Sequence, residues 1–183
     1  MIFAQNGSIW FFGGGDGNGN NTFDAAGLDF SGGQVSIIGG GLGQLSTFEG
    51  CATLSDNSGH FVLYTDGSTV YDKTHTAMPN GTGLYGSFSC TQSAVIGPVP
   101  GMSDQFYVFT NESFNQTSSA SFHGLSYSKI DLKLPGNGTI SCPLGDIDTL
   151  EKNILLADST NEKVCIVPHS NGTDYWVVCQ AKT

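Results

Sequence analysis

Residues 55–67, SDNSGHFVLYTDG, contain the side chains from which a metal site or an acid–base site could be built. Asp56, Asn57 and Asp66 offer oxygen ligands, and the imidazole of His60 can bind a metal or transfer a proton. A simpler structure fits the same residues, because Asp, Asn, Ser and Gly are the usual residues of turns and strand-forming residues lie between them. We therefore predict two turns that bracket a buried strand, in which each Asp accepts hydrogen bonds from backbone N–H groups.

A second candidate for metal binding is the glycine-rich run at residues 16–21, DGNGNN, where oxygen ligands alternate as at the start of a calcium loop. An EF-hand loop needs Gly at its sixth position and Glu at its twelfth, and these positions hold Asn21 and Gly27. We expect a glycine-rich surface loop instead, with a looser calcium site as the alternative. Four histidines are present: His60, His75, His123 and His169. They form no HExxH motif, so we predict turn or surface roles, no metal ligand and no cofactor-binding residue.

Signatures of covalent or hydrolytic catalysis are missing. The GxSxG motif is absent, and the 16 acidic residues show no defined carboxylate pair of the kind that a glycosidase needs. We therefore predict no catalytic residue and a protein that is not an enzyme. The alternative is a hydrolase that acts on polysaccharides, in which Asp56 or Asp66 would be essential.

Composition excludes several classes of partner. The net charge is −10, and all six cationic side chains are lysines. Nucleic-acid binding is therefore not expected, since it relies on clustered Lys and Arg. No apolar run approaches the roughly 18 to 20 residues that span a membrane. An acidic, weakly charged surface suits a secreted or periplasmic protein that meets neutral ligands.

Five cysteines are present: Cys51, Cys90, Cys142, Cys165 and Cys179. No CxxC pair occurs, so neither a zinc ribbon nor a redox motif is indicated. For most of them we expect small, buried, apolar side chains. A disulfide between Cys165 and Cys179 is the alternative, because these residues flank the turn-forming pair Asn171-Gly172 and could meet across a hairpin.

Short apolar runs between turn signals indicate an all-β fold, supported by 26 glycines and only 12% charged residues. The predicted strands are residues 8–13, 34–38, 51–54, 60–64, 69–72, 92–96, 105–110, 124–132, 152–157, 163–167 and 175–179.

An internal repeat groups three of these strand pairs. Each copy has a strand of small apolar residues, a polar turn and an aromatic strand, and Phe61, Phe106 and Tyr175 mark the three aromatic strands. The first interval is about 45 residues, within the range of β-propeller blades, and the second needs an insertion of about 20. The polar loop at residues 111–123 could supply most of it. We predict about three antiparallel propeller blades, which form an incomplete propeller because closure takes about 4 to 8.

The chain also resembles the N-terminal β-propeller region of large secreted surface proteins of Bacteroidota. The resemblance rests on IWFFG, AGLDF, residues 49–100 with their SDxxGxxxxYTDG and MPNG elements, QFYVFTNES, LSYSKIDL and EKVCIVPHSNGTDYWVV. Such proteins continue into PKD-type repeats and a gliding-motility-associated or sorting domain. The resemblance implies export and a propeller used for binding or display, and it brings no catalytic residues.

Taken together, the sequence predicts a non-catalytic, secreted or cell-surface module for adhesion to a glycan or a surface protein. Trp10, Tyr85 and Tyr175 lie near turns and could stack on sugars. A purely architectural surface or virion protein is a further alternative. Residues 1–5 are expected to be the remnant of a signal peptide, the alternative being a chance pattern. Residues 6–183 are expected to form one domain that is truncated at its C-terminus, completed by the remaining blades of a longer chain or by a homo-oligomer.

Overall fold

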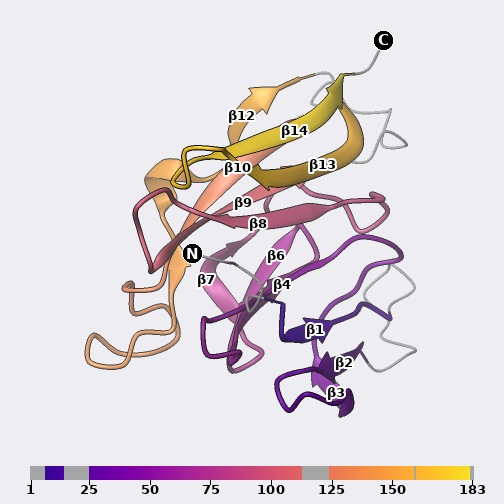
Figure 1. The fold of residues 1–183 in the computed structure, drawn as a ribbon, viewed down its shortest axis with the longest axis vertical. Coiled ribbons are helices and arrows are strands. Elements are labelled where there is room, and N and C mark those ends of the chain that lie inside the picture. The colour runs from indigo at the N-terminus through magenta and orange to yellow at the C-terminus, as the bar shows by residue number, and fades with distance from the viewer. Residues whose placement is uncertain (1–6, 15–24, 113–123, 159, 182–183) are drawn as a thin grey trace.

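The computed structural model describes residues 7–14, 25–112, 124–158 and 160–181. These residues form an all-β structure of several antiparallel sheets, none of which closes on itself. Four sheets follow one another in chain order, from sheet 1 at the bottom of Figure 1 to sheet 4 at the top. The predicted all-β class is therefore confirmed. No helix in the described ranges has the length and apolar character needed to cross a membrane.

Each sheet is built mainly from strands that are neighbours in the sequence. Sheet 1 contains β1 (Ile9–Phe11), β2 (Ala25–Asp29) and β3 (Ser36–Gly43). Sheet 2 contains β4 (Ala52–Ser55), β5 (Phe61–Thr65), β6 (Thr69–Asp72) and β7 (Ala77–Thr82). Sheet 3 contains β8 (Ala94–Pro98), β9 (Gln105–Asn111), β10 (Leu125–Asp131), β11 (Asp146–Ile147) and β12 (Ile154–Ala157), with the short 3-10 helix η1 (Thr149–Glu151) between the last two. Sheet 4 is the hairpin of β13 (Thr160–Pro168) and β14 (Tyr175–Ala181).

Three apolar clusters lie at the three junctions between successive sheets. Phe11 and Tyr64 belong to the cluster between sheets 1 and 2. The largest cluster joins sheets 2 and 3 and contains Leu54, Leu63, Val70, Met78, Leu84, Ala94, Val108, Ile130 and Ile147. Phe109, Leu125 and Val164 join sheets 3 and 4. Sheets 2 and 3 are therefore packed on both faces, whereas each outer sheet has one neighbour among the described residues.

The first strands of sheets 2, 3 and 4 begin at the same end of the molecule. The hydroxyl of Ser93, beside the start of β8, donates to the Gly50 carbonyl just before β4 at 2.6 Å. The N–H of Gln92 donates to the Glu162 carbonyl near the start of β13 at 3.1 Å. Sheet 1 differs, because β1 runs antiparallel to β4: the N–H of Ile9 donates to Ser55 Oγ and the N–H of Phe11 to Thr53 Oγ1.

The predicted strands and the internal repeat correspond to observed elements. Phe61, Phe106 and Tyr175 lie on β5, β9 and β14, the second strands of sheets 2, 3 and 4. The repeat therefore covers three of the four sheets. The insertion predicted at residues 111–123 lies almost entirely outside the described residues. Part of the added length of sheet 3 is instead the excursion after β10 that carries β11 and η1.

The strands β2, β7 and β11 are absent from the sequence prediction. The AMPNGT segment of β7 contains Pro79, Asn80 and Gly81, which are turn residues, yet it pairs with β6 through a register shift. Proline has no N–H to donate. It is tolerated here because a residue at a bulge in an edge strand need not donate a hydrogen bond to a neighbouring strand.

The expected behaviour of the cysteines is corrected by the structure. In the β13–β14 register Cys165 lies opposite Val178, and Cys179 lies opposite Val164. Successive residues of a strand point to opposite faces, so the two thiols lie on different faces and the disulfide alternative is wrong. All five cysteines are free, and burial holds fully only for Cys90, since Cys142 and Cys165 are exposed.

Candidate functional site

The acids of residues 55–67 hold turns, as the sequence predicts. Asp56 Oδ1 accepts hydrogen bonds from the N–H groups of Ser58 at 2.8 Å and His60 at 2.9 Å. Burial opposes ionisation of Asp56, but the hydrogen bonds from His60 and Ser58 outweigh it and lower the pKa of the carboxyl group. Asp66 Oδ1 likewise accepts from the N–H groups of Ser68 and Thr69, at 2.9 and 2.8 Å.

These two carboxylates do not form a glycosidase pair. Asp56 precedes β5 and Asp66 follows it, and a strand of five residues is about 17 Å long. Paired glycosidase carboxylates lie roughly 5 to 10 Å apart. The two acids nominated for the hydrolase alternative are therefore engaged separately, each in its own turn.

The remaining metal candidates divide into residues inside and outside the described structure. Residues 16–21 and His123 lie outside it. His169 Nδ1 accepts a hydrogen bond from the N–H of Asn171 at 3.1 Å, inside the β13–β14 turn. His75 stacks on Phe61 with ring centroids 5.4 Å apart. Within the described ranges no group of three or more His, Cys, Asp or Glu side chains is arranged to hold a metal ion.

A neutral cleft opens where the hairpin turns of sheets 2, 3 and 4 meet. Its volume is about 330 Å³. The β4–β5 turn contributes Asn57, and the β13–β14 turn contributes Gly172 and Thr173. The last residue of β8 and the β8–β9 connection contribute residues 98–103. Phe106 on β9 and Tyr175 on β14 complete the lining. The convergence follows from the common direction of β4, β8 and β13, which places the turn after each strand at one end of the molecule.

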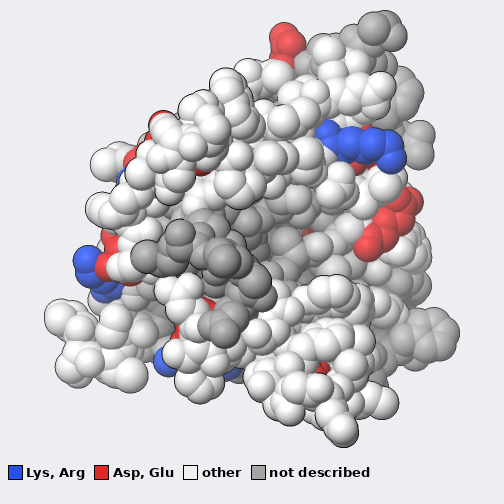
Figure 2. Space-filling view, viewed as in Figure 1, with Lys and Arg blue, Asp and Glu red and all other residues white. Residues whose placement is uncertain are grey.

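The lining of the cleft is apolar with a few polar groups. Phe106, Met102 and Tyr175 supply large apolar surfaces, beside two prolines. Asn57, Ser103 and Thr173 supply an amide and two hydroxyl groups. Burial raises the pKa of the Tyr175 phenol, which is therefore neutral at physiological pH. None of the described lining residues is charged. Figure 2 shows that uncharged residues cover most of the molecular face drawn, and that some of its few charged residues lie beside one of opposite sign.

The turns that form the cleft are held by their own hydrogen bonds. The N–H of Met102 donates to the Val99 carbonyl at 3.0 Å, and the N–H of Gly172 donates to the His169 carbonyl at 3.1 Å. The amide of Asn171 donates to the Asp174 carboxylate at 2.7 Å. The cleft is therefore preformed, as small-molecule sites usually are.

Of the three aromatic residues predicted to meet sugars, only Tyr175 lines the cleft. Trp10 lies on β1, 48% exposed, and packs on Phe30 with ring centroids 5.1 Å apart. Tyr85 follows sheet 2, where its N–H donates to Asn153 Oδ1. Asn57, for which the sequence predicts a turn and offers only a metal-ligand alternative, also lines the cleft. A signal for its role does exist, since aligned turns of a repeat meet at one end when the sheets stack in order.

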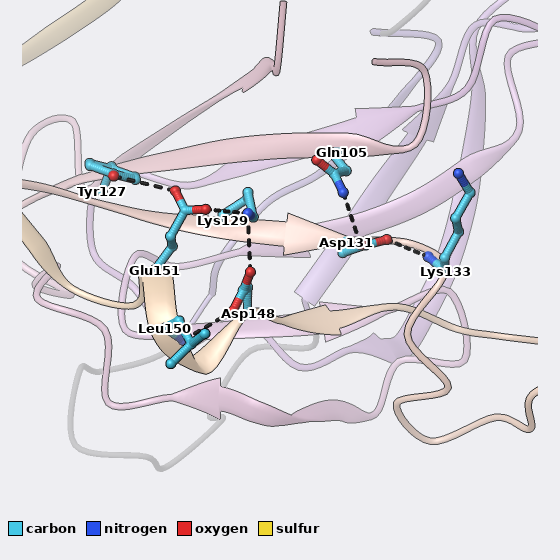
Figure 3. A network of polar contacts seen from close by, with 8 residues as sticks. All are labelled: Gln105, Tyr127, Lys129, Asp131, Lys133, Asp148, Leu150 and Glu151. Carbon is cyan, nitrogen blue, oxygen red and sulfur yellow. Dashed lines mark hydrogen bonds and ion pairs between the residues drawn. The ribbon is translucent and has the colours of Figure 1, made fainter.

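A second polar cluster braces sheet 3 and has a structural role. Figure 3 shows Lys129 between the carboxylates of Asp148 and Glu151, with Asp148 at 3.0 Å. These ion pairs raise the pKa of the lysine and hold η1, which interrupts the outer strand, against β10. Asp146 on β11 is buried and accepts from the backbone N–H and the side-chain amide of Asn80 on β7, at 2.9 and 2.7 Å. The hydrogen bonds between Asp146 and Asn80 join sheet 3 to sheet 2.

Comparison with known proteins gives no match to a family model, to a curated protein or to a solved structure. The class of protein is thus described by its geometry: an all-β chain of successive open antiparallel sheets, with a preformed neutral cleft at the turns of three of them.

Proposed function

We propose that this protein is a non-catalytic binding module, secreted or displayed at the cell surface, whose cleft binds a neutral saccharide. The single observation that carries the proposal is the cleft itself, in which aromatic and apolar side chains surround a few uncharged polar groups. Among the described residues, no side chain that lines the cleft has the charge or the proton affinity for acid–base catalysis at neutral pH. Its volume of about 330 Å³ lies at the lower end of the usual range for ligand sites, about 300 to 1,000 Å³.

We propose further that the sheets are blades of a β-propeller. Sheets 2 and 3 contain four strand positions each, as propeller blades do. The first strands of sheets 2, 3 and 4 share a direction, as innermost blade strands around a common axis would. Sheet 1, whose β1 is antiparallel to β4, does not follow this pattern and would be an adapted terminal element.

The saccharide class follows from the chemistry of the lining. The face of a pyranose ring is apolar and stacks on aromatic rings such as that of Tyr175, while its hydroxyl groups need uncharged donors and acceptors. Asn57, Ser103 and Thr173 provide these in the lining of the cleft. An acidic or basic ligand would gain no counter-charge here, so a neutral sugar fits better than a phosphate or a charged peptide.

A glycan array of neutral oligosaccharides, followed by calorimetric titration of those bound, tests the proposal. We expect Tyr175→Ala to weaken binding about tenfold or more, equivalent to about 1.4 kcal/mol of lost stacking. The matched control is Trp10→Ala, which removes a larger exposed ring outside the cleft and should leave the affinity unchanged. Binding of no neutral glycan by the wild-type chain, or an equal loss in both variants, would refute the proposed site.

A further inference from the structure

The outer edge of β14 is open within the described part of the protein. β14 is seven residues long and pairs with β13 on one side, and no described strand pairs with its other side. Sheet 4 therefore has two strands, whereas sheets 2 and 3 have four strand positions each. Such an edge presents unpaired backbone donors and acceptors to any extended strand.

This edge lacks the features by which proteins usually prevent strand addition. Residues 175–181, YWVVCQA, contain neither a charged residue nor a proline. The outer strands of sheets 2 and 3 differ. β7 contains Pro79 and a register shift, while β11 and β12 are only two and four residues long. Prolines, bulges and short strands are the usual means of blocking an edge.

The β13–β14 hairpin also exposes one apolar face. Trp176 lies opposite Val167, and Val178 lies opposite Cys165, all on the face turned to solvent. Trp176 and Val178 are 58% and 51% exposed. The other face carries Val164 and packs on sheet 3. An added strand would therefore meet an edge that is buried on one face and apolar on the other.

The direction of the unpaired groups follows from the pairing with β13. The N–H of His169 donates to the Asp174 carbonyl at the turn, and antiparallel pairs alternate between hydrogen-bonded and non-hydrogen-bonded. By this alternation Trp176 and Val178 bond to β13. The N–H and carbonyl groups of Val177 and Cys179 point to the open edge.

We propose that two copies of this chain pair through β14, antiparallel across a twofold axis, to form a continuous sheet β13–β14–β14–β13. Edge-to-edge pairing about a twofold perpendicular to the sheet is antiparallel, and the same residues serve both copies. The resulting sheet has four strands, like sheets 2 and 3. The chain carries a net charge of −10, which opposes association in general. The uncharged β14 allows two copies to meet without bringing like charges together.

Analytical ultracentrifugation of the full chain from 1 to 100 µM, in about 0.1 M salt, tests this pairing. We expect the wild type to be dimeric at the upper concentrations and Val178→Lys to be monomeric, since two lysines would lie close together on one face across the new strand pair. The matched control is Val167→Lys, on the same exposed face but on β13. Its symmetry mate lies three strand spacings away, about 14 Å, beyond the screening length of about 10 Å, so we expect a dimer.

Three outcomes would contradict the pairing of two copies through β14. A wild type that stays monomeric up to 100 µM overturns the proposal. Loss of the dimer in Val167→Lys as well would indicate face-to-face packing and would also overturn it, as would a dimer that Val178→Lys leaves intact. If Val178→Lys fails to fold, amide hydrogen exchange of the wild type replaces it. The N–H groups of Val177 and Cys179 should then become protected as concentration rises, and unchanged exchange would contradict the pairing.

Discussion

The inner sheets and the outer sheets use similar apolar residues in different surroundings. Leu63 in sheet 2 and Ile130 in sheet 3 are fully buried, whereas Ile37 in sheet 1 is 78% exposed and Trp176 in sheet 4 is 58% exposed. The difference arises because, among the residues that the structure describes, an inner sheet packs on two neighbours and an outer sheet on one. Position in the stack, more than residue type, therefore determines how much each apolar side chain contributes to stability.

The largest effect should come from removing a side chain at the junction of sheets 2 and 3. We expect Leu63→Ala to lower the free energy of unfolding by about 2–5 kcal/mol, because it leaves a cavity in the main core. Val167→Ala in sheet 4, where the side chain is 45% exposed, should change it by less than about 0.5 kcal/mol. Urea denaturation of both variants measures the difference, and similar losses would mean that sheet 4 is as buried as sheet 2.

A smaller effect separates the two turns at the ends of β5. Asp66 is buried and accepts three hydrogen bonds through Oδ1, from two backbone N–H groups and the Ser68 hydroxyl. Asp66→Ala should cost about 2–3 kcal/mol, and Asp56→Ala, in an exposed turn, about 1 kcal/mol. Asp66→Asn is the control, since its side-chain oxygen can keep the same bonds. Thermal unfolding should show the larger loss of stability for Asp66→Ala. A larger loss for Asp56→Ala would show that burial does not determine how much each turn contributes to stability.

The smallest expected effect is a pH-dependent contribution of His75 to stability at the junction of sheets 1 and 2. Burial lowers the pKa of His75 below its ordinary 6.5, against the opposing charge of Asp72. The ring packs on Phe11 and Phe61 and lies 3.2 Å from the Tyr64 hydroxyl. Because the folded state prefers the neutral ring, this contribution is complete above pH 6.5 and is lost as pH falls through the folded pKa.

We therefore expect the wild type to lose more thermal stability between pH 7.5 and 5.5 than His75→Asn. Asparagine suits this control because residue 75 has a φ of 63°, a left-handed conformation that Asn adopts readily. Asp56 and Asp72 do not contribute to the pH dependence between pH 7.5 and 5.5, because their pKa values are lowered from 3.8 and both groups titrate below this range. Equal losses in both proteins would remove His75 as the source of the pH dependence.

Much of the strand pattern was readable from local sequence, and the exceptions have physical causes. β6 was predicted at its observed bounds, because Thr69–Asp72 is a β-rich run between two turns. β7 was missed because Pro79 and Gly81 act locally as turn residues, and only pairing with β6 and packing of Met78 in the core make the segment a strand. Tertiary contacts there outweigh local preference.

The candidate site was predictable only in part. Tyr175 could be proposed from its place beside a turn, and the roles of Asp56 and Asp66 followed from turn chemistry. The cleft itself depends on three turns that are far apart in sequence. Asn57 and Thr173 lie in turns of different sheets, and nothing local in either segment marks them as neighbours. Only the order in which the sheets stack brings them together.

The pairing of neighbouring strands within each sheet also bears on how the chain folds during synthesis. In sheet 2 every pairing joins consecutive strands, so only short loops must close before hydrogen bonds form. Each hairpin can therefore assemble as it leaves the ribosome. Burial lags behind pairing, because Leu63 and Val70 are covered only when Val108 and Ile130 of sheet 3 arrive. During that interval sheet 2 exposes its apolar face, and the rate of translation through sheet 3 sets how long this aggregation-prone state lasts.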